Sequence, residues 1–293
     1  MVNYQCDAIY DIKKTEVEYL VIPETGQKYQ ATIYSPIPKR DETFSLFPIL
    51  LDVHGGAWQG GSRFDGEYMD KSLAASGILV AAVVFRIAPE DPYPAQVQDV
   101  NYALRWWKSA CGNYGGDPTT LGALGLSSGG HTLMLNVLKP NDPIYSHHSL
   151  DSEYDASVVY SIGSSAVLDS HARYLYAKKI GRTNLIEGSL GYFHDEETMR
   201  EGNPQLVLER GEHESLPSTL LIHGAADAAV PNAIPEKYAL TYSDAGGNIE
   251  LRMFEGMHHN FAREPLPESH QAIEMIKNFI SENIPQFQGL CSI

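Results

Sequence analysis

Two unbroken apolar runs lie early in the chain, each bounded by turn residues. The first covers residues 47–53 and leads into His54-Gly55-Gly56, and the second covers residues 77–85. Runs without polar alternation are typical of strands that are covered on both faces of a sheet. The segment between them, residues 66–76, has a helix-compatible composition and is followed by Gly77, the residue type expected just past a helix end. The pattern predicts a strand–helix–strand unit.

The same alternation continues along the chain. Residues 95–110 place apolar side chains three and four positions apart, which indicates an amphipathic helix. Further strands are expected at 121–126, 157–162, 219–223 and 249–254, and further helices at 131–138, 236–245 and 268–283. Alternating strands and helices of this length favour an α/β fold with a mostly parallel, doubly wound sheet.

Two segments break the alternation. Residues 16–21 and 29–34 are strand-like and are separated by turn residues, which predicts an N-terminal antiparallel hairpin on the sheet edge. Residues 168–217 are polar, and four glycines interrupt their weak helical pattern: Gly181, Gly188, Gly191 and Gly202. We therefore expect a small loop-rich insertion there, before the strand at 219–223. Because the chain has no repeat and no Pro- and Gly-rich linker, residues 1–293 are expected to form a single domain.

Composition and charge narrow the classes of partner. The chain has 37 acidic and 21 basic residues, so its formal net charge is −16, which disfavours nucleic acid and anionic membrane surfaces. No stretch approaches the roughly 18 apolar residues of a membrane span. Residues 1–14 lack the pattern of a secretory signal, so a cytoplasmic protein is expected.

The cysteines give no sign of a disulfide framework or a thiolate metal site. Cys6, Cys111 and Cys291 are odd in number, widely spaced and without a CxxC pair, so reduced thiols are expected. Adjacent histidines point apart on a regular backbone, and the chain has no H-E-x-x-H spacing. No metal site is predicted.

The strongest local signal is Gly125-Leu126-Ser127-Ser128-Gly129, a G-x-S-x-G motif between a predicted strand and a predicted helix. This context is that of a nucleophile elbow, in which a sharp turn exposes the serine hydroxyl. Such a turn needs small neighbours two residues away on each side, and Gly125 and Gly129 meet that need. Ser127 is the candidate nucleophile, at a helix N-terminus that favours a developing negative charge.

A second signal, His54-Gly55-Gly56-Ala57-Trp58, follows the first buried strand. Consecutive glycines let the backbone approach a substrate oxygen closely. The amides of Gly55, Gly56 and Ser128 are therefore candidates for an oxyanion hole. Trp58 and His54 are weaker candidates for substrate contact, against the alternatives of simple packing and of a loop hydrogen bond.

A serine nucleophile needs a base, and the base needs an acid that orients it. Asp227 follows the predicted strand at 219–223 and is the candidate acid. The last predicted strand is followed by a loop with two histidines, His258 and His259, and either satisfies the chain order Ser, Asp, His. The residues alone leave this choice open.

Over most of residues 45–285 the chain resembles the α/β-hydrolase fold esterases related to hormone-sensitive lipase and to the bacterial acetylxylan and feruloyl esterases. Besides the elbow and the three loops above, the motifs are Arg86-Ile-Ala-Pro-Glu90, Tyr93-Pro94-Ala95, Asp99 and Tyr114-Gly-Gly-Asp117-Pro118. The resemblance implies His259 as the base and a structural ion pair between Arg86 and Asp99. At the level of the family, a homodimer through an edge strand or the terminal helices is also expected.

Three positions depart from the family pattern. Ser128 stands where alanine is common, Asn260 replaces a usual glycine, and Phe85 replaces a tyrosine. None removes a candidate catalytic group: Ser128 supplies its backbone N–H whatever its side chain, and asparagine tolerates a left-handed backbone.

Together the motifs predict a serine carboxylesterase that forms an acyl-enzyme on small to medium carboxylic esters and needs no cofactor. The alternative on the same site is an amide hydrolase of the kynurenine formamidase type, because the His54–Trp58 loop fits that pattern too. A third hypothesis is a catalytically silent hydrolase-fold binding protein, but such proteins usually carry a damaged triad. His131 and His223 are expected to be structural, whereas Tyr192, Phe193 and His194 are candidates for pocket or lid contacts.

Overall fold

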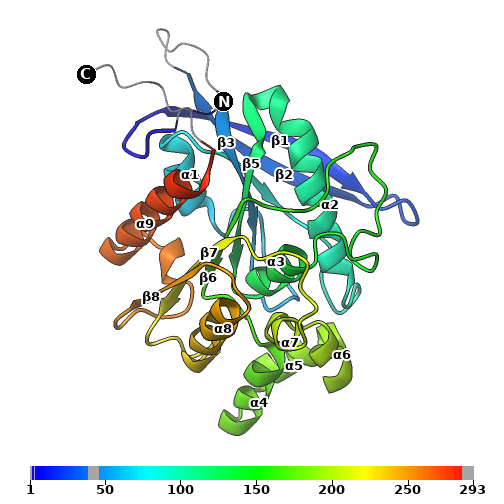
Figure 1. Cartoon of the computed structure of the whole chain (residues 1–293). Coiled ribbons are helices and arrows are strands. Elements are labelled where there is room, and N and C mark those ends of the chain that lie inside the picture. The colour runs from blue at the N-terminus through cyan, green and yellow to red at the C-terminus, as the bar shows by residue number, and fades with distance from the viewer. Residues whose placement is uncertain (1, 3, 39–45, 286–293) are drawn as a thin grey trace.

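The computed structural model describes residues 2, 4–38 and 46–285, and within them it forms one eight-stranded sheet (Figure 1). The strand order is β1-β2-β4-β3-β5-β6-β7-β8. The strands are β1 (Asp11–Val21), β2 (Lys28–Ile37), β3 (Phe47–Val53), β4 (Leu79–Val83), β5 (Gly116–Leu126), β6 (Tyr160–Ser164), β7 (Ser218–Gly224) and β8 (Ile249–Phe254). β2 runs antiparallel to β1 and β4, and the other pairs are parallel. The predicted α/β-hydrolase fold, with its hairpin at the sheet edge, is confirmed.

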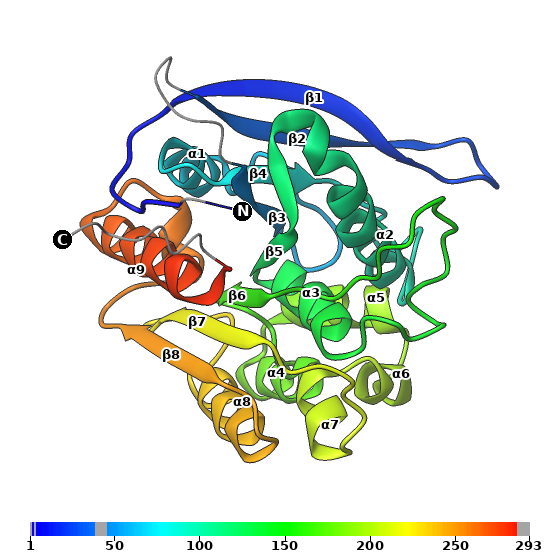
Figure 2. The same ribbon diagram turned by 45° about the horizontal axis from the view of Figure 1, so that its top comes forward.

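Helices cover both faces of this sheet (Figure 2). They are α1 (Glu67–Ala75), α2 (Ala95–Ala110), α3 (Ser128–Leu138), α8 (Ala233–Asp244) and α9 (Pro267–Asn283), with short 3-10 turns at Cys111–Tyr114 and Phe261–Arg263. Side chains of one strand alternate between the faces, so Ile49 and Leu51 join the core beneath α2 and α3 while Leu50 joins the core beneath α1 and α9. This double coverage explains the unbroken apolar runs. No helix in the described ranges is long and apolar enough to cross a membrane.

Several predicted boundaries are too narrow. β1 begins at Asp11 and β5 at Gly116, several residues before the apolar runs that marked them. Much of β1 is exposed and carries polar side chains, so hydrophobicity reveals only its inner part. The prediction for β6 is displaced instead of too narrow, because the strand lies at Tyr160–Ser164 and not at 157–162.

The expectation of a loop-rich insertion is wrong, because the segment is mostly helical: α4 (Ser170–Ile180), α5 (Thr183–Phe193), α6 (Glu196–Glu201) and α7 (Pro204–Glu209). Gly181 and Gly202 do not interrupt helices but end them. Gly188 and Gly191 lie inside α5, where a Cβ on Gly191 would come within 2.3 Å of the Gln59 side chain. These two glycines therefore allow α5 to pack closely on the loop that follows β3.

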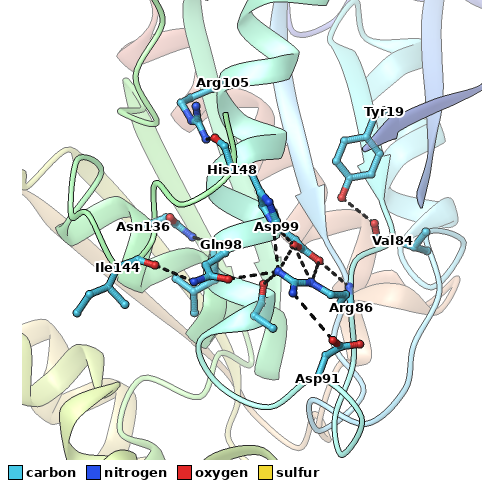
Figure 3. Close-up of polar contacts among 12 residues, drawn as sticks. Tyr19, Val84, Arg86, Asp91, Gln98, Asp99, Arg105, Asn136, Ile144 and His148 are labelled. Atoms are coloured by element: carbon cyan, nitrogen blue, oxygen red, sulfur yellow. Dashed lines mark hydrogen bonds and ion pairs between the residues drawn. The ribbon is translucent and has the colours of Figure 1, made fainter. Parts of the chain in front are cut away.

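The connection between β4 and α2 is fixed by Arg86 and Asp99, which confirms the predicted ion pair (Figure 3). The buried Asp99 carboxylate accepts hydrogen bonds from the Arg86 backbone N–H at 2.9 Å and from Nη2 at 2.7 Å. His148 Nε2 lies 2.8 Å from the same carboxylate. The connection then presents Ala88, whose N–H donates to the Trp58 carbonyl oxygen at 2.9 Å. The ion pair thus supports the loop that carries Trp58.

Cys6 and Cys111 are free thiols, and Cys291 lies outside the described residues.

Candidate active site

Ser127 sits on a sharp turn between β5 and α3. Its backbone is strained, with φ 52° and ψ −118°. A Cβ on Gly129 would lie 2.1 Å from the His54 carbonyl oxygen, and a Cβ on Gly125 would lie 2.6 Å from the Gly130 Cα. Glycine at position 129 is therefore required for the close crossing of this turn with the end of β3, and glycine at position 125 for the tight turn itself, where β5 meets the start of α3. The elbow predicted from G-x-S-x-G has the expected geometry.

The structure brings together the three predicted triad side chains, each from the loop after a different strand. Ser127 Oγ lies 2.8 Å from His259 Nε2, and His259 Nδ1 lies 2.7 Å from Asp227 Oδ2. An ionised carboxylate can only accept a hydrogen bond, so His259 Nδ1 must carry the proton that it donates to Asp227. The other ring nitrogen, Nε2, is then unprotonated, and its lone pair faces Ser127. A hydroxyl, a base and an orienting acid are thus aligned.

Asp227 is held in place by the backbone of its own loop. Its Oδ1 accepts hydrogen bonds from the N–H groups of Ala229 and Val230 at 2.8 and 2.9 Å. Burial alone would raise the pKa of this carboxyl, but the hydrogen bond and charge of His259 and the two amides outweigh burial and keep the pKa below its ordinary value. Asp227 is therefore the ionised member of the series. Arg173 of α4, which the sequence did not single out, donates from Nε to the Ala229 carbonyl oxygen at 3.2 Å and braces the loop.

The other two histidines of this region lie outside the series. The His258 side chain is half-exposed, and its Nδ1 contacts the His259 carbonyl oxygen instead of Ser127. His223 is buried at the end of β7 and its Nε2 donates to the Val230 carbonyl oxygen at 3.0 Å. Of the two histidines left open by the residues, the geometry selects His259.

The candidate oxyanion loop, residues 55–61, crosses directly over the elbow. A Cβ on Gly55 would come within 3.0 Å of the Ser127 Cβ, so this backbone passes very close to the nucleophile. Within the described part of the chain, the N–H groups of Gly55, Gly56 and Ser128 donate to no protein acceptor. Three amides near the serine are thus left to receive a negatively charged oxygen.

The loop is fixed through Trp58, by contacts that the sequence did not reveal. The Trp58 backbone N–H donates to Ser128 Oγ at 3.1 Å, and its carbonyl oxygen accepts from Gln96 Nε2 at 2.6 Å. Its indole Nε1 donates to His131 Nδ1, and His131 Nε2 donates to the Gly202 carbonyl oxygen at 2.7 Å. Burial lowers the pKa of His131 to about 4, so this imidazole is neutral and can accept.

The two weaker substrate candidates occupy supporting positions. Trp58 and His54 are each 1% exposed. Trp58 stacks on Tyr192, and His54 stacks on Phe85 while its Nδ1 donates to the Gly55 carbonyl oxygen. The structure therefore favours packing and loop anchoring for both over direct substrate contact. Tyr192 is buried in the same aromatic cluster, whereas His194 is exposed.

Comparison with known proteins gives one family match and several similar proteins that are described as esterases. The sequence profile of the BD-FAE family matches residues 32–239. Among curated proteins, the probable isoprenylcysteine alpha-carbonyl methylesterase ICME of Oryza sativa subsp. japonica is 27% identical over 230 residues, which are 75% of this chain and 53% of that protein. Esterase LipC of Mycobacterium tuberculosis is 30% identical over 202 residues, which are 66% of this chain and 47% of that protein. The chain thus spans about half the length of these relatives.

Among solved structures, esterase Est2 of Thermogutta terrifontis with bound propionate is similar, with a TM-score of 0.70 and 22% identity. The match covers 93% of this chain and 94% of that one. At this identity the likeness establishes a shared fold.

Proposed function

The chain belongs to the BD-FAE family, and from this premise we propose that it is a serine carboxylesterase that hydrolyses small to medium carboxylic esters. The observation that carries the proposal is the hydrogen-bonded series Ser127–His259–Asp227 on a strained elbow, facing amides without protein acceptors. The propionate held by the similar Thermogutta enzyme supports a short acyl group.

In the acylation half, His259 Nε2 takes the proton of Ser127 Oγ as that oxygen attacks the ester carbonyl carbon. The carbonyl oxygen becomes an oxyanion and accepts hydrogen bonds from the amides of Gly55, Gly56 and Ser128. Asp227 stabilises the imidazolium that forms and prevents the ring from turning. When the tetrahedral intermediate collapses, His259 returns its proton to the departing alkoxide, and the alcohol leaves an acyl-Ser127 ester behind.

The deacylation half repeats these steps with water. His259 removes a proton from a water molecule that attacks the acyl carbon, and the same amides hold the second oxyanion. Collapse breaks the bond to Ser127 Oγ, which regains its proton from His259, and the carboxylic acid is released.

The test is covalent labelling by a fluorophosphonate, followed by intact mass on wild type and Ser127→Ala. We expect one adduct on wild type and none on the variant, together with at least about a thousandfold lower turnover of p-nitrophenyl butyrate by the variant. Ser243→Ala, which removes an exposed hydroxyl on α8, serves as the matched control and should label like wild type. A folded wild type that does not label would refute the proposal and favour a binding protein.

An ester and an amide place the same demands on this site until the leaving group departs, so substrate comparison must separate them. We expect turnover of short p-nitrophenyl esters to exceed that of N-formylkynurenine in kcat/KM. The reverse order would assign the chain to the formamidase type.

A further inference from the structure

The peptide group that joins Ala228 to Ala229 lies between the candidate acid and an arginine of the insertion. Its N–H, which belongs to Ala229, donates to Asp227 Oδ1 at 2.8 Å. Its carbonyl oxygen, which belongs to Ala228, accepts a hydrogen bond from Arg182 Nη1 at 3.2 Å. The N–H and C=O of a trans peptide group lie in one plane and point in opposite directions. A guanidinium and a carboxylate therefore face the two ends of the same peptide dipole.

The next peptide group repeats this arrangement with a second arginine. Its N–H, from Val230, donates to the same Asp227 Oδ1 at 2.9 Å. Its carbonyl oxygen, from Ala229, accepts from Arg173 Nε at 3.2 Å. Arg173 lies within α4, and Arg182 comes two residues after the end of that helix. Hydrogen bonds that run in series polarise and strengthen one another, and here two such series end on one carboxylate oxygen.

Arg173 is buried without a carboxylate in contact. It is 3% exposed, and within the described ranges its only hydrogen bond is the one from Nε, while Nη1 has no partner. Its Cζ lies 5.5 Å from the centroid of the Trp58 ring. Burial lowers the pKa of Arg173 to about 10, and the negative charge of Asp227 opposes that decrease. The guanidinium is therefore charged at neutral pH. A buried cation without a contact ion pair is costly, which indicates a role beyond packing.

We propose that Arg173 and Arg182 are positioning residues of the triad, which hold the Asp227 carboxylate through the two peptide groups between them. The inference rests on the proposed function, in which Asp227 must keep His259 aligned and stabilise its imidazolium. Without either arginine, the peptide groups bind the carboxylate less strongly, and the acid loop, residues 227–230, gains freedom to turn. Helix α4 of the insertion thus contributes to the alignment of the triad as well as to the fold.

The first test is steady-state hydrolysis of p-nitrophenyl butyrate by Arg182→Gln, which removes the charge at a partly exposed position. We expect kcat to fall about three- to tenfold with KM within about twofold of wild type, because alignment is lost and no substrate contact is removed. Arg182→Lys keeps a charged donor and should return kcat to within about twofold of wild type. Arg200→Gln is the matched control, since its guanidinium on α6 contacts Glu196 and His171 and not the acid loop. It should leave kcat and KM unchanged.

Arg173→Met and Arg173→Lys test the buried arginine. Methionine fills the space of the side-chain stem without a charge or a donor, and kcat should fall about tenfold. Lysine keeps both and should recover most of that loss. The midpoint of thermal unfolding, recorded for each variant, shows whether the protein is folded in the assay. If Arg173→Met does not fold, the Arg182 variants decide the test.

A double-mutant cycle separates positioning from a general structural role. In an Asp227→Ala background the carboxylate is absent, so adding Arg182→Gln should change the residual kcat by less than about twofold. A substitution that only loosens the insertion would lower kcat by the same factor in both backgrounds. The residual turnover is measured at high enzyme concentration.

An equal loss of kcat in both backgrounds would overturn the inference. So would a wild-type kcat in both Arg182→Gln and Arg173→Met, and so would a rise in KM alone, which would assign the arginines to substrate binding. These results leave the esterase intact, because the wild type still cleaves the ester. If the wild type neither cleaves esters nor labels at Ser127, the proposed function itself fails and this inference fails with it.

Discussion

The Ser128 hydroxyl lies between the nucleophile helix α3 and the oxyanion loop, where it accepts the Trp58 N–H. Ala57 and Trp58 both have positive φ, at 53° and 64°, which non-glycine residues adopt only when their surroundings hold them there. A hydrogen bond at that point fixes the loop relative to Ser127. In the esterase family that this sequence resembles, alanine is common at position 128, and alanine cannot accept a hydrogen bond from the Trp58 N–H. The oxyanion loop of this chain therefore has an additional anchor.

Ser128→Ala should therefore lower kcat about three- to tenfold and change KM little, because the backbone amide stays and only its alignment loosens. The measurement is steady-state hydrolysis of p-nitrophenyl butyrate, with the midpoint of thermal unfolding recorded alongside. Ser243→Ala again provides the reference. A wild-type kcat in Ser128→Ala would show that the loop holds its shape without the hydroxyl.

Single residues were predictable from sequence where a motif follows a strand. Ser127, Asp227 and the histidine pair belong to this kind, because parallel strands deliver their following loops to one edge of the sheet. The bonds of Trp58 to Ser128 and Gln96 are of another kind, since they join residues 70 and 38 positions apart. No local spacing encodes such contacts.

The crossing of β3 by the β5–α3 turn depends on a missing side chain. At Gly129, a Cβ would lie 2.1 and 2.3 Å from two backbone oxygens of β3 and its loop, those of His54 and Val53. Backbone cannot move aside as a flexible side chain can. The two elements approach as closely as they do only because position 129 is glycine.

Gly129→Ala should cost about 3 kcal/mol or more of unfolding free energy and abolish esterase turnover. Urea denaturation followed by circular dichroism measures the first effect. Gly112→Ala is the paired control: a Cβ there meets nothing within 4 Å, so its stability should stay within about 0.5 kcal/mol of wild type. Equal stability of the two variants would contradict the proposed steric demand.

Elements with long apolar stretches were found from the sequence, and the short helices of the insertion were missed. Their start signals are nevertheless present. Asp169, Asp195 and Asn203 each accept a hydrogen bond from the backbone N–H three residues later, and Pro204 occupies the first turn of α7. The four glycines led to the prediction of a loop despite these caps. From sequence alone, a glycine that ends a helix looks the same as a glycine inside a helix that allows close packing.

The net charge of the whole molecule is −16. Most acidic side chains of such a protein lie in water, but two carboxyl groups are buried side by side. Asp52 of β3 and Asp70 of α1 are 1% and 0% exposed, and none of their oxygens has a hydrogen-bond partner among the described residues. A Cβ on Gly66 would lie 2.9 and 3.5 Å from an oxygen of each, so both face this glycine. Burial raises the pKa of Asp52 to about 7, and burial together with the charge of Asp52 raises the pKa of Asp70 as well.

These folded-state pKa values exceed the unfolded value of about 3.9. At pH values between the unfolded and the folded pKa, the native state therefore binds more protons than the unfolded state. The stability from this pair is thus complete below about pH 4 and is lost as the pH rises through about 7. Asp52→Asn, which does not ionise, should exceed wild type in unfolding free energy by more than about 1 kcal/mol at pH 8, with a smaller difference at pH 4. Chemical denaturation at both pH values checks this, and a difference independent of pH would contradict it.

The order in which the chain supplies its triad has a consequence during synthesis. The triad residues follow three strands of the sheet in chain order: Ser127 comes after β5, Asp227 after β7 and His259 after β8. His131, which lies on α3 just after the elbow, also depends on a later segment, because its Nε2 donates to the Gly202 carbonyl oxygen. A chain still growing on the ribosome carries its nucleophile long before its base. We therefore expect reactivity toward a fluorophosphonate to appear late and abruptly, once the last strand has joined the sheet, so that labelling reports the completion of folding.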